Sequence, residues 1–226
     1  MNFLSHYYFE RNNTNSNMVI GTVLPDLVKN AQKDLNLYPQ KKTTLFIDDE
    51  NLNALLIGWK RHLEVDLIFH SSTFFIDEMA KLKQLLLPIL HSSPVRPSFL
   101  SHIGVELVLD HLLVINGKIN INSFYDHLNA VEKVHLNDFL LKCGAENTDQ
   151  FFKFFDSFKS SRYLLSYQKL ENISYALQRI CMRLWAHPFD EQTVDLLTEQ
   201  LAIYKISLEK NYQDIFDEIE VKLKGW

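Results

Sequence analysis

Apolar side chains recur every three or four residues through most of this chain, a spacing typical of amphipathic α-helices. The apolar and aromatic start at 1–10 is expected to pack into the fold. Residues 18–30 predict a helix in which Pro25 marks the first turn or a kink, and Asn17 is a candidate cap. A loop is expected over 31–48. Two further helices are predicted, one capped by Asp48 or Asp49 and one running from Ser71 or Ser72 to Leu90.

The most apolar helix is predicted over 95–115, where leucine, isoleucine and valine occupy nearly every face, so it is expected to be the central buried helix. Gly144 fits a helix C-cap and Pro188 the first turn of the last helix. Four later stretches keep a helical period: 122–143, 148–159, 164–186 and 188–224. With only 6 glycines and 6 prolines in 226 residues, the chain is predicted to be all-α, a single compact domain of about eight helices over 1–226.

Composition excludes several classes of protein. The net charge of −5, without a long run of either sign, argues against a general nucleic-acid binder. No signal peptide or membrane span is predicted, since the apolar run at 85–90 is too short to cross a bilayer. Cys143 and Cys181 are expected to be buried thiols, and the protein is expected to be cytoplasmic. The amphipathic stretch 188–224 is expected to pack on the chain's own core, with homodimerisation as the alternative.

Histidines and carboxylates form two ladders within the predicted helices. Residues four apart lie on one face of a helix, so each ladder offers a column of side chains that bind divalent metals. Two such columns facing each other would make a cage for a hydrolytic metal. The first ladder is His62, Asp66 and His70, and the second is His102, Glu106 and Asp110, followed by His111.

Each ladder also has an interpretation without a metal. His62 and Asp66 can form a surface ion pair one helical turn apart, and His70 can be an ordinary histidine at a helix end. Glu106 and Asp110 lie in a helix that is otherwise apolar, so both carboxylates need partners. Those partners are either a metal or a buried hydrogen-bonded network.

Four short segments, in the same order and at the same spacing, resemble motifs of the acyl carrier protein phosphodiesterase family. They are MNFLSH at 1–6, GTVLPD at 21–26, GWKRHLEVD at 58–66 and DHLL at 110–113, and a weaker match is ALQRICMR at 176–183. The chain departs from the family at Thr22, where asparagine is usual, and after Asp66, where a Thr-Asp pair is common.

The resemblance implies an all-helical fold distantly similar to the HD-type metal phosphohydrolases. It implies Mn²⁺-dependent hydrolysis of the phosphodiester that joins 4′-phosphopantetheine to a serine of acyl carrier protein, with Mg²⁺, Fe²⁺ or Zn²⁺ as other candidate ions. By position it implies four metal ligands, Asp26, His62, Asp66 and Asp110, with His6 and His111 beside them as catalytic residues. His70, His102 and Glu106 lie outside the family's motifs.

Two other functions stay open at this point. One is a different HD-like metal phosphohydrolase, acting on a nucleotide or a phospholipid head group, in which His70, His102 and Glu106 are additional ligands. The other is a non-catalytic helical binding protein that keeps the ladders as a structural network. In either hydrolase, a nearby arginine would stabilise phosphoryl charge, with Arg61, Arg179 and Arg183 as candidates.

Overall fold

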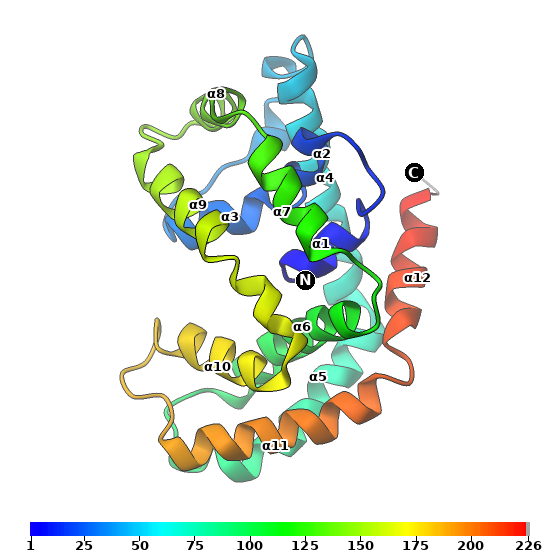
Figure 1. The fold of residues 1–226 in the computed structure, drawn as a ribbon, viewed down its shortest axis with the longest axis vertical. Coiled ribbons are helices and arrows are strands. Elements are labelled where there is room, and N and C mark those ends of the chain that lie inside the picture. The colour runs from blue at the N-terminus through cyan, green and yellow to red at the C-terminus, as the bar shows by residue number, and fades with distance from the viewer. Residues whose placement is uncertain (225–226) are drawn as a thin grey trace. The chain divides into compact units, whose positions relative to one another are not determined.

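The computed structural model describes residues 1–224, and over that range it is all-helical, which confirms the predicted fold class (Figure 1). The helices divide between two compact units. Unit 1 comprises 1–2, 67–118 and the chain from 165 onward, and unit 2 comprises 3–66 and 119–164. The similarity to HD-type folds and the single domain over 1–226 stay predictions.

The described residues form twelve α-helices rather than about eight, because several predicted stretches are interrupted. Unit 2 also holds two short 3₁₀ turns, Pro39–Lys41 and Thr43–Leu45. Its helices are α1 (Phe3–Tyr8), α2 (Ser16–Gly21), α3 (Leu24–Ala31), α7 (Ile121–Ala130), α8 (Lys133–Cys143), α9 (Asp149–Ser161) and the part of α4 (Glu50–Ser71) up to Asp66.

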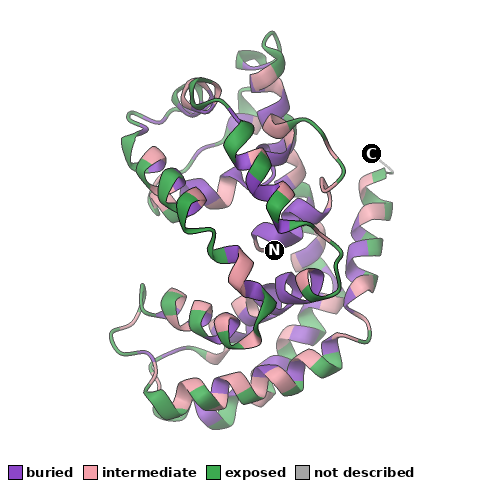
Figure 2. Ribbon diagram, in the orientation of Figure 1, coloured by how far each residue is buried: buried purple, intermediate pink, exposed green. Residues whose placement is uncertain are grey.

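Helix α1 forms part of the core of unit 2, because all six of its residues are buried (Figure 2). The ring of Tyr7 lies 5.0 Å from that of Phe124 on α7. Helix α2 packs on α7, and α3 packs on α9. The apolar start of the chain is therefore packed into the fold, as predicted.

The single helix expected over 18–30 is two helices in the structure. Asn15, not Asn17, caps α2 by accepting a hydrogen bond from the backbone N–H of Met18. Pro25 lies in the first turn of α3. In one continuous helix its ring would clash with the carbonyl of Gly21 and leave that carbonyl without a donor. The chain therefore ends α2 before the proline and begins a new helix around it.

Unit 1 contains the remaining helices. In it α6 packs against α5 and α10, and α11 packs against α5 and α10. Its elements are the end of α4 from Leu67, α5 (Thr73–Leu86), the 3₁₀ turn Leu87–Ile89, α6 (Pro97–Ile115), α10 (Leu170–Cys181), α11 (Glu191–Leu208) and α12 (Tyr212–Lys224). The 3₁₀ segment Tyr163–Gln168 begins in unit 2 and ends in unit 1.

Helix α6 is the central buried helix that the sequence predicted. By length and composition it could cross a membrane, but 67% of its most apolar 18-residue window is buried within the protein. Such burial is typical of a core helix in a globular fold. Its apolar surface therefore packs against other parts of this chain.

Cap residues at several later helix ends confirm the sequence-based boundaries, but the predicted start of the last helix is not confirmed. Asp49 caps α4 and Ser72 caps α5. Gly144 ends α8 with a φ of 112°, a left-handed conformation that glycine adopts without strain. The last stretch was predicted wrongly: α11 begins at Glu191 with Asp190 as its cap, so Pro188 lies before it. The stretches 122–143 and 188–224 each divide into two helices.

Candidate functional site

Two glycines bring α2 and α4 into backbone contact in unit 2. A Cβ atom added at Gly21 would lie 2.8 Å from the Cα of Gly58, and one added at Gly58 would lie 2.6 Å from the Cα of Gly21. Real Cβ atoms do not approach other carbons so closely. Glycine is therefore required on both helices if they are to cross at this distance.

The close crossing of the two helices positions the imidazole of His62, one turn beyond Gly58. Thr22 directly follows Gly21, and its backbone carbonyl accepts a hydrogen bond from His62 Nδ1 at 2.8 Å. A carbonyl oxygen can only accept, so Nδ1 carries the proton. In the neutral imidazole, Nε2 then has a lone pair available for a metal ion.

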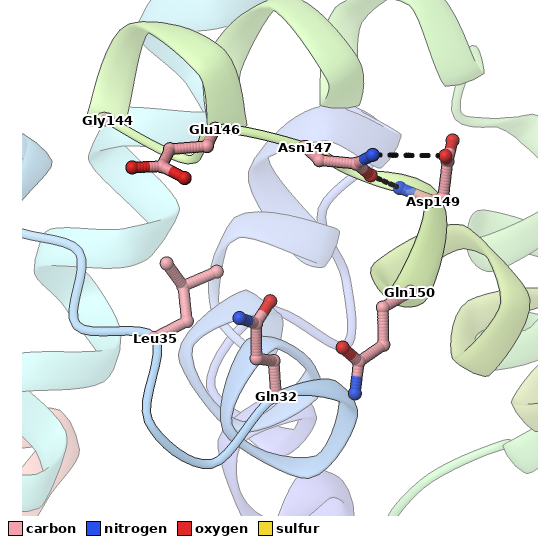
Figure 3. Close-up of a pocket in the computed structure, with 7 residues that line it drawn as sticks. All are labelled: Gln32, Leu35, Gly144, Glu146, Asn147, Asp149 and Gln150. Carbon is pink, nitrogen blue, oxygen red and sulfur yellow. Dashed lines mark hydrogen bonds between the residues drawn. The ribbon is translucent and has the colours of Figure 1, made fainter.

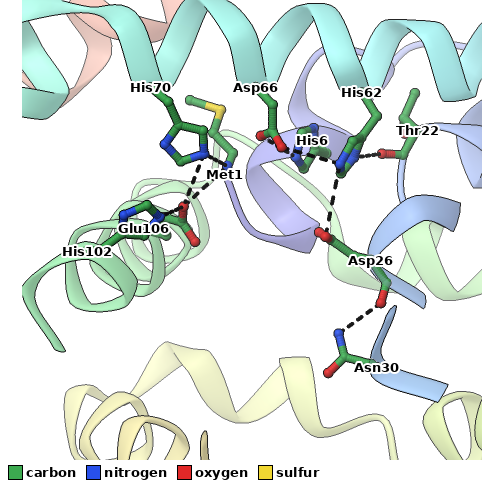
Figure 4. A network of polar contacts seen from close by, with 10 residues as sticks. All are labelled: Met1, His6, Thr22, Asp26, Asn30, His62, Asp66, His70, His102 and Glu106. Atoms are coloured by element: carbon green, nitrogen blue, oxygen red, sulfur yellow. Dashed lines mark hydrogen bonds and ion pairs between the residues drawn. The ribbon is translucent and has the colours of Figure 1, made fainter. Parts of the chain in front are cut away.

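His6, His62 and Asp66 meet around that lone pair (Figure 4). The two imidazole rings stack with centroids 3.9 Å apart. His62 Nε2 lies 3.5 Å from Asp66 Oδ2, and His6 Nε2 lies 3.2 Å from Asp66 Oδ1. Both histidines are buried, so this is not the surface ion pair that His62 and Asp66 alone could have formed.

Asp26 reaches the same cluster from the first turn of α3. Its Oδ1 lies 4.0 Å from His62 Nε2. Asn30, one turn further along α3, donates a hydrogen bond to the backbone carbonyl of Asp26 at 2.9 Å. The structure thus brings together four of the sequence-predicted site residues on three helices of unit 2, and we call this group the His6 cluster: His6, Asp26, His62 and Asp66.

Burial and neighbouring charges set the protonation states in the His6 cluster. Burial, reinforced by the adjacent imidazole of His62, lowers the pKa of His6 to about 3. Burial raises the pKa of Asp66, but the hydrogen bond from His6 and the nearby imidazoles outweigh it and hold that pKa well below its usual range. At neutral pH a neutral imidazole therefore lies beside an ionised carboxylate.

We predict that His6 makes the stability of the metal-free protein depend on pH. The unfolded chain binds a proton at His6 below pH 6.5, whereas the folded chain does so only near pH 3. The neutral His6 therefore costs no stability above pH 6.5, but the free energy of unfolding decreases as the pH falls from 6.5 towards 3. Between pH 7 and pH 5 the free energy of unfolding should decrease by about 2 kcal/mol. His6→Gln should remove this loss, as measured by urea unfolding at both pH values.

The matched control is His91→Gln, which replaces an exposed histidine and should leave the pH dependence unchanged. Asp66 does not contribute in this window, because its lowered pKa affects stability only below its unfolded value of 3.8. Parallel pH profiles for the wild type and His6→Gln would contradict the prediction.

The donor atoms of the His6 cluster have the spacing that a divalent ion requires. Ligand atoms about 2.0–2.2 Å from a tetrahedral ion stand about 3.3–3.6 Å apart. The separations of 3.2 and 3.5 Å between the imidazole nitrogens and the Asp66 oxygens fall close to this range. One ligand atom from each of His6, His62 and Asp66 lies within 4.8 Å of the other two. His6 Nδ1 is also buried without a hydrogen-bond partner among the described residues. Imidazole and carboxylate together suit Mn²⁺, Fe²⁺ or Zn²⁺.

The members of each ladder do not all lie at the same site. His70, from the first ladder, joins His102 and Glu106 of the second in a separate group within unit 1. Neither the periodicity nor the family motifs predicted this pairing. It depends on how the end of α4 packs in unit 1, which no local pattern in the sequence specifies.

Asp110 and His111 also lie in unit 1, on α6. Asp110 is fully buried, and His111 donates a hydrogen bond from Nδ1 to the backbone carbonyl of Tyr167 at 2.7 Å. Burial lowers the pKa of His111, so its imidazole is neutral at physiological pH. The roles predicted for Asp110 as a metal ligand and for His111 in catalysis stay predictions.

Sequence reasoning missed the positioning role of Thr22, Gly21 and Gly58. The available signal was a glycine inside each of two predicted helices, since such glycines often mark a close approach of backbones. Arg61, a candidate for binding phosphoryl charge, lies beside two carboxylates: its Nε is 3.5 Å from Glu10 Oε1, and its Nη1 is 3.7 Å from Glu64 Oε2.

A separate hollow of 460 Å³ in unit 2 has no such cluster (Figure 3). Asn147 holds Asp149 through a side-chain hydrogen bond of 3.1 Å, and its own side chain accepts from the backbone N–H of Asp149. Asp149 is thereby committed to the turn before α9. The lining residues are Gln32, Leu35, Gly144, Glu146, Asn147, Asp149 and Gln150.

Comparison with known proteins gives one match, and it covers nearly the whole chain. A sequence model of the family described as acyl carrier protein phosphodiesterase matches residues 1–219. No curated protein and no solved structure matches. The match includes every helix of the His6 cluster and all four motifs noted in the sequence.

Proposed function

Because this chain belongs to the acyl carrier protein phosphodiesterase family, a family of hydrolases, we propose that it releases 4′-phosphopantetheine from holo acyl carrier protein. Water would attack phosphorus, and the bond to the serine oxygen of the carrier protein would break. The serine oxygen takes up a proton, so that the products are apo carrier protein and phosphopantetheine. The His6 cluster is the proposed site of this reaction.

The orientation of His62 is the observation that carries the proposal. Its Nδ1 donates to the carbonyl of Thr22, so the lone pair of Nε2 faces the oxygens of Asp26 and Asp66. A cation between this lone pair and the two carboxylates would be attracted by all three groups. This arrangement supports binding of a divalent metal by His62, Asp26 and Asp66.

The residues of the His6 cluster have separate tasks in this proposal. When bound, a divalent ion supplies Lewis-acid chemistry, lowering the pKa of water and neutralising phosphoryl charge. Asp26 and Asp66 provide the negative charge that holds the ion, and Thr22 fixes the tautomer of His62. His6 keeps Asp66 ionised, and its neutral imidazole can accept a proton near the reacting phosphorus.

Incubation of holo acyl carrier protein with the purified chain and Mn²⁺ tests the proposal. We expect the carrier protein to lose the mass of one phosphopantetheine, and we expect a chelator to stop the reaction and added Mn²⁺ to restore it. Intact-protein mass spectrometry measures the loss. If the carrier protein stays intact although the chain binds Mn²⁺, the substrate assignment is wrong.

A second hydrolase function is supported by the additional group formed by His70, His102 and Glu106. An enzyme with this further ligand set could act on a nucleotide or a phospholipid head group. A panel of nucleotide, phospholipid and carrier-protein substrates separates the two functions. Turnover of the first two classes without loss of phosphopantetheine would favour the alternative.

A further inference from the structure

A second group of metal-binding side chains lies in unit 1, outside the motifs of the family (Figure 4). His102 and Glu106 are one turn apart on α6, and His70 lies near the end of α4. His102 Nε2 lies 3.2 Å from Glu106 Oε1, and His70 Nε2 lies 3.6 Å from the same oxygen. We call these three residues the Glu106 cluster.

Aromatic contacts hold the two imidazoles of the Glu106 cluster in place. The rings of His70 and His102 stack with centroids 5.0 Å apart. Phe75 on α5 presents an edge-to-face contact to each of them, at 4.9 and 5.0 Å. Rings fixed in this way lose little conformational entropy when they bind an ion.

The spacing of the donor atoms fits an ion with N and O ligands. Around a tetrahedral zinc ion, ligand atoms stand about 3.3–3.6 Å apart. The separations of 3.2 and 3.6 Å to Glu106 Oε1 lie close to this range. All three ligand atoms fall within 4.8 Å of one another. Two imidazoles and one glutamate are also a ligand set that catalytic zinc sites use.

Glu106 is buried, with a side chain only 11% exposed, so its charge needs compensation. The Met1 amino nitrogen supplies part of it, at 3.4 Å from Glu106 Oε1 and 3.5 Å from His70 Nε2. An ammonium group can only donate, so the lone pair of His70 Nε2 points towards this nitrogen. A cation is therefore already favoured at the place where the three ligand atoms converge.

We infer that the Glu106 cluster is a second metal site, which binds Zn²⁺ in preference to Mn²⁺. Imidazole favours zinc, whereas manganese prefers oxygen ligands. The Glu106 cluster has a single carboxylate for two imidazoles, whereas the His6 cluster has two carboxylates for two imidazoles. The bound ion takes over the charge compensation of Glu106 that the Met1 amino nitrogen supplies in part.

The ion has a route to the Glu106 cluster from solvent. His102 is 39% exposed and lines a groove of 630 Å³ in unit 1. Phe99 and Trp185, with ring centroids 5.2 Å apart, also line this groove, as does Arg96. An open position on the ion would thus be reachable by an anionic ligand from this groove.

Zinc counting on the full chain tests the inference. The protein is stripped with a chelator, loaded with Zn²⁺, washed and measured by elemental mass spectrometry. His102→Gln should remove one equivalent of zinc, because loss of a ligand weakens binding by at least about 100-fold. His91→Gln, at an exposed histidine outside both clusters, should remove none.

His62→Gln separates the two sites, because it should spare the zinc that His102→Gln removes. The same preparations are assayed on holo carrier protein, so a failure of the proposed function is distinguished from a failure of this site. If His102→Gln and the wild type bind equal amounts of zinc, or if the wild type binds none, the inference is overturned.

A measurement on the wild type avoids any folding defect of the variants. Zinc should protect His70 and His102 from carbethoxylation by about tenfold or more, as resolved by peptide mass spectrometry, since a ligated nitrogen cannot react. His91 serves as the internal reference. Equal modification of His70 and His102 with and without Zn²⁺ would show that the cluster only pairs with the amino terminus.

Discussion

Replacing Asp66 by asparagine is expected to lower kcat/KM for holo acyl carrier protein by about 10³-fold, because a metal ion supplies several kcal/mol of transition-state stabilisation. Asp66 contacts both His6 and His62. Asparagine keeps the shape of the side chain but removes the charge that holds a divalent ion. Initial rates at saturating and limiting carrier protein, with metal content measured on the same samples, provide the test.

Glu64→Gln is the matched control, since Glu64 is an exposed carboxylate on the same helix, α4. It removes the same charge from the chain without touching the His6 cluster, so activity and metal content should both stay close to wild type. Full activity of Asp66→Asn would remove Asp66 from the site. Normal metal content with lost activity would instead make Asp66 a base or an orienting group.

Replacing Gly58 by alanine is expected to destabilise the protein by about 2 kcal/mol and to disrupt the site. Overpacking against a backbone is expected at the upper end of its usual range, about 3 kcal/mol, while alanine regains about 1 kcal/mol of helix propensity. The added Cβ would lie 2.6 Å from the Cα of Gly21, so α2 and α4 must separate. That movement would break the hydrogen bond from His62 to Thr22.

Thermal unfolding should show the change as a fall in Tm of about 4–8 °C. Activity should fall in the residual folded protein as well, because His62 loses its orientation. Gly104→Ala is the control: its Cβ would meet only side-chain atoms of Leu82, with Cδ2 nearest at 2.7 Å, so no helix backbone would have to move. If Gly58→Ala unfolds at the wild-type temperature and keeps its activity, the glycine crossing does not position the site.

Helix periodicity predicted the all-α class correctly because burial of an amphipathic face is a local property of the sequence. The fully apolar stretch at 95–115 indicated a buried helix, and α6 is buried. Breaks between helices were harder to predict. An extended stretch such as 188–224 keeps its period across Glu209–Asn211, where the chain leaves α11 and enters α12.

The sequence by itself determined the family, because its motifs are contiguous and ordered along the chain. It also identified His62, Asp66 and Asp26 as candidates for one site, through spacing and motif position. Only the tertiary structure decided that His6 stacks on His62, and that His70 leaves its ladder to join His102 and Glu106. The physical reason is that helix spacing specifies which side chains share a face, whereas backbone packing, such as the contact of Gly21 with Gly58, specifies which faces meet.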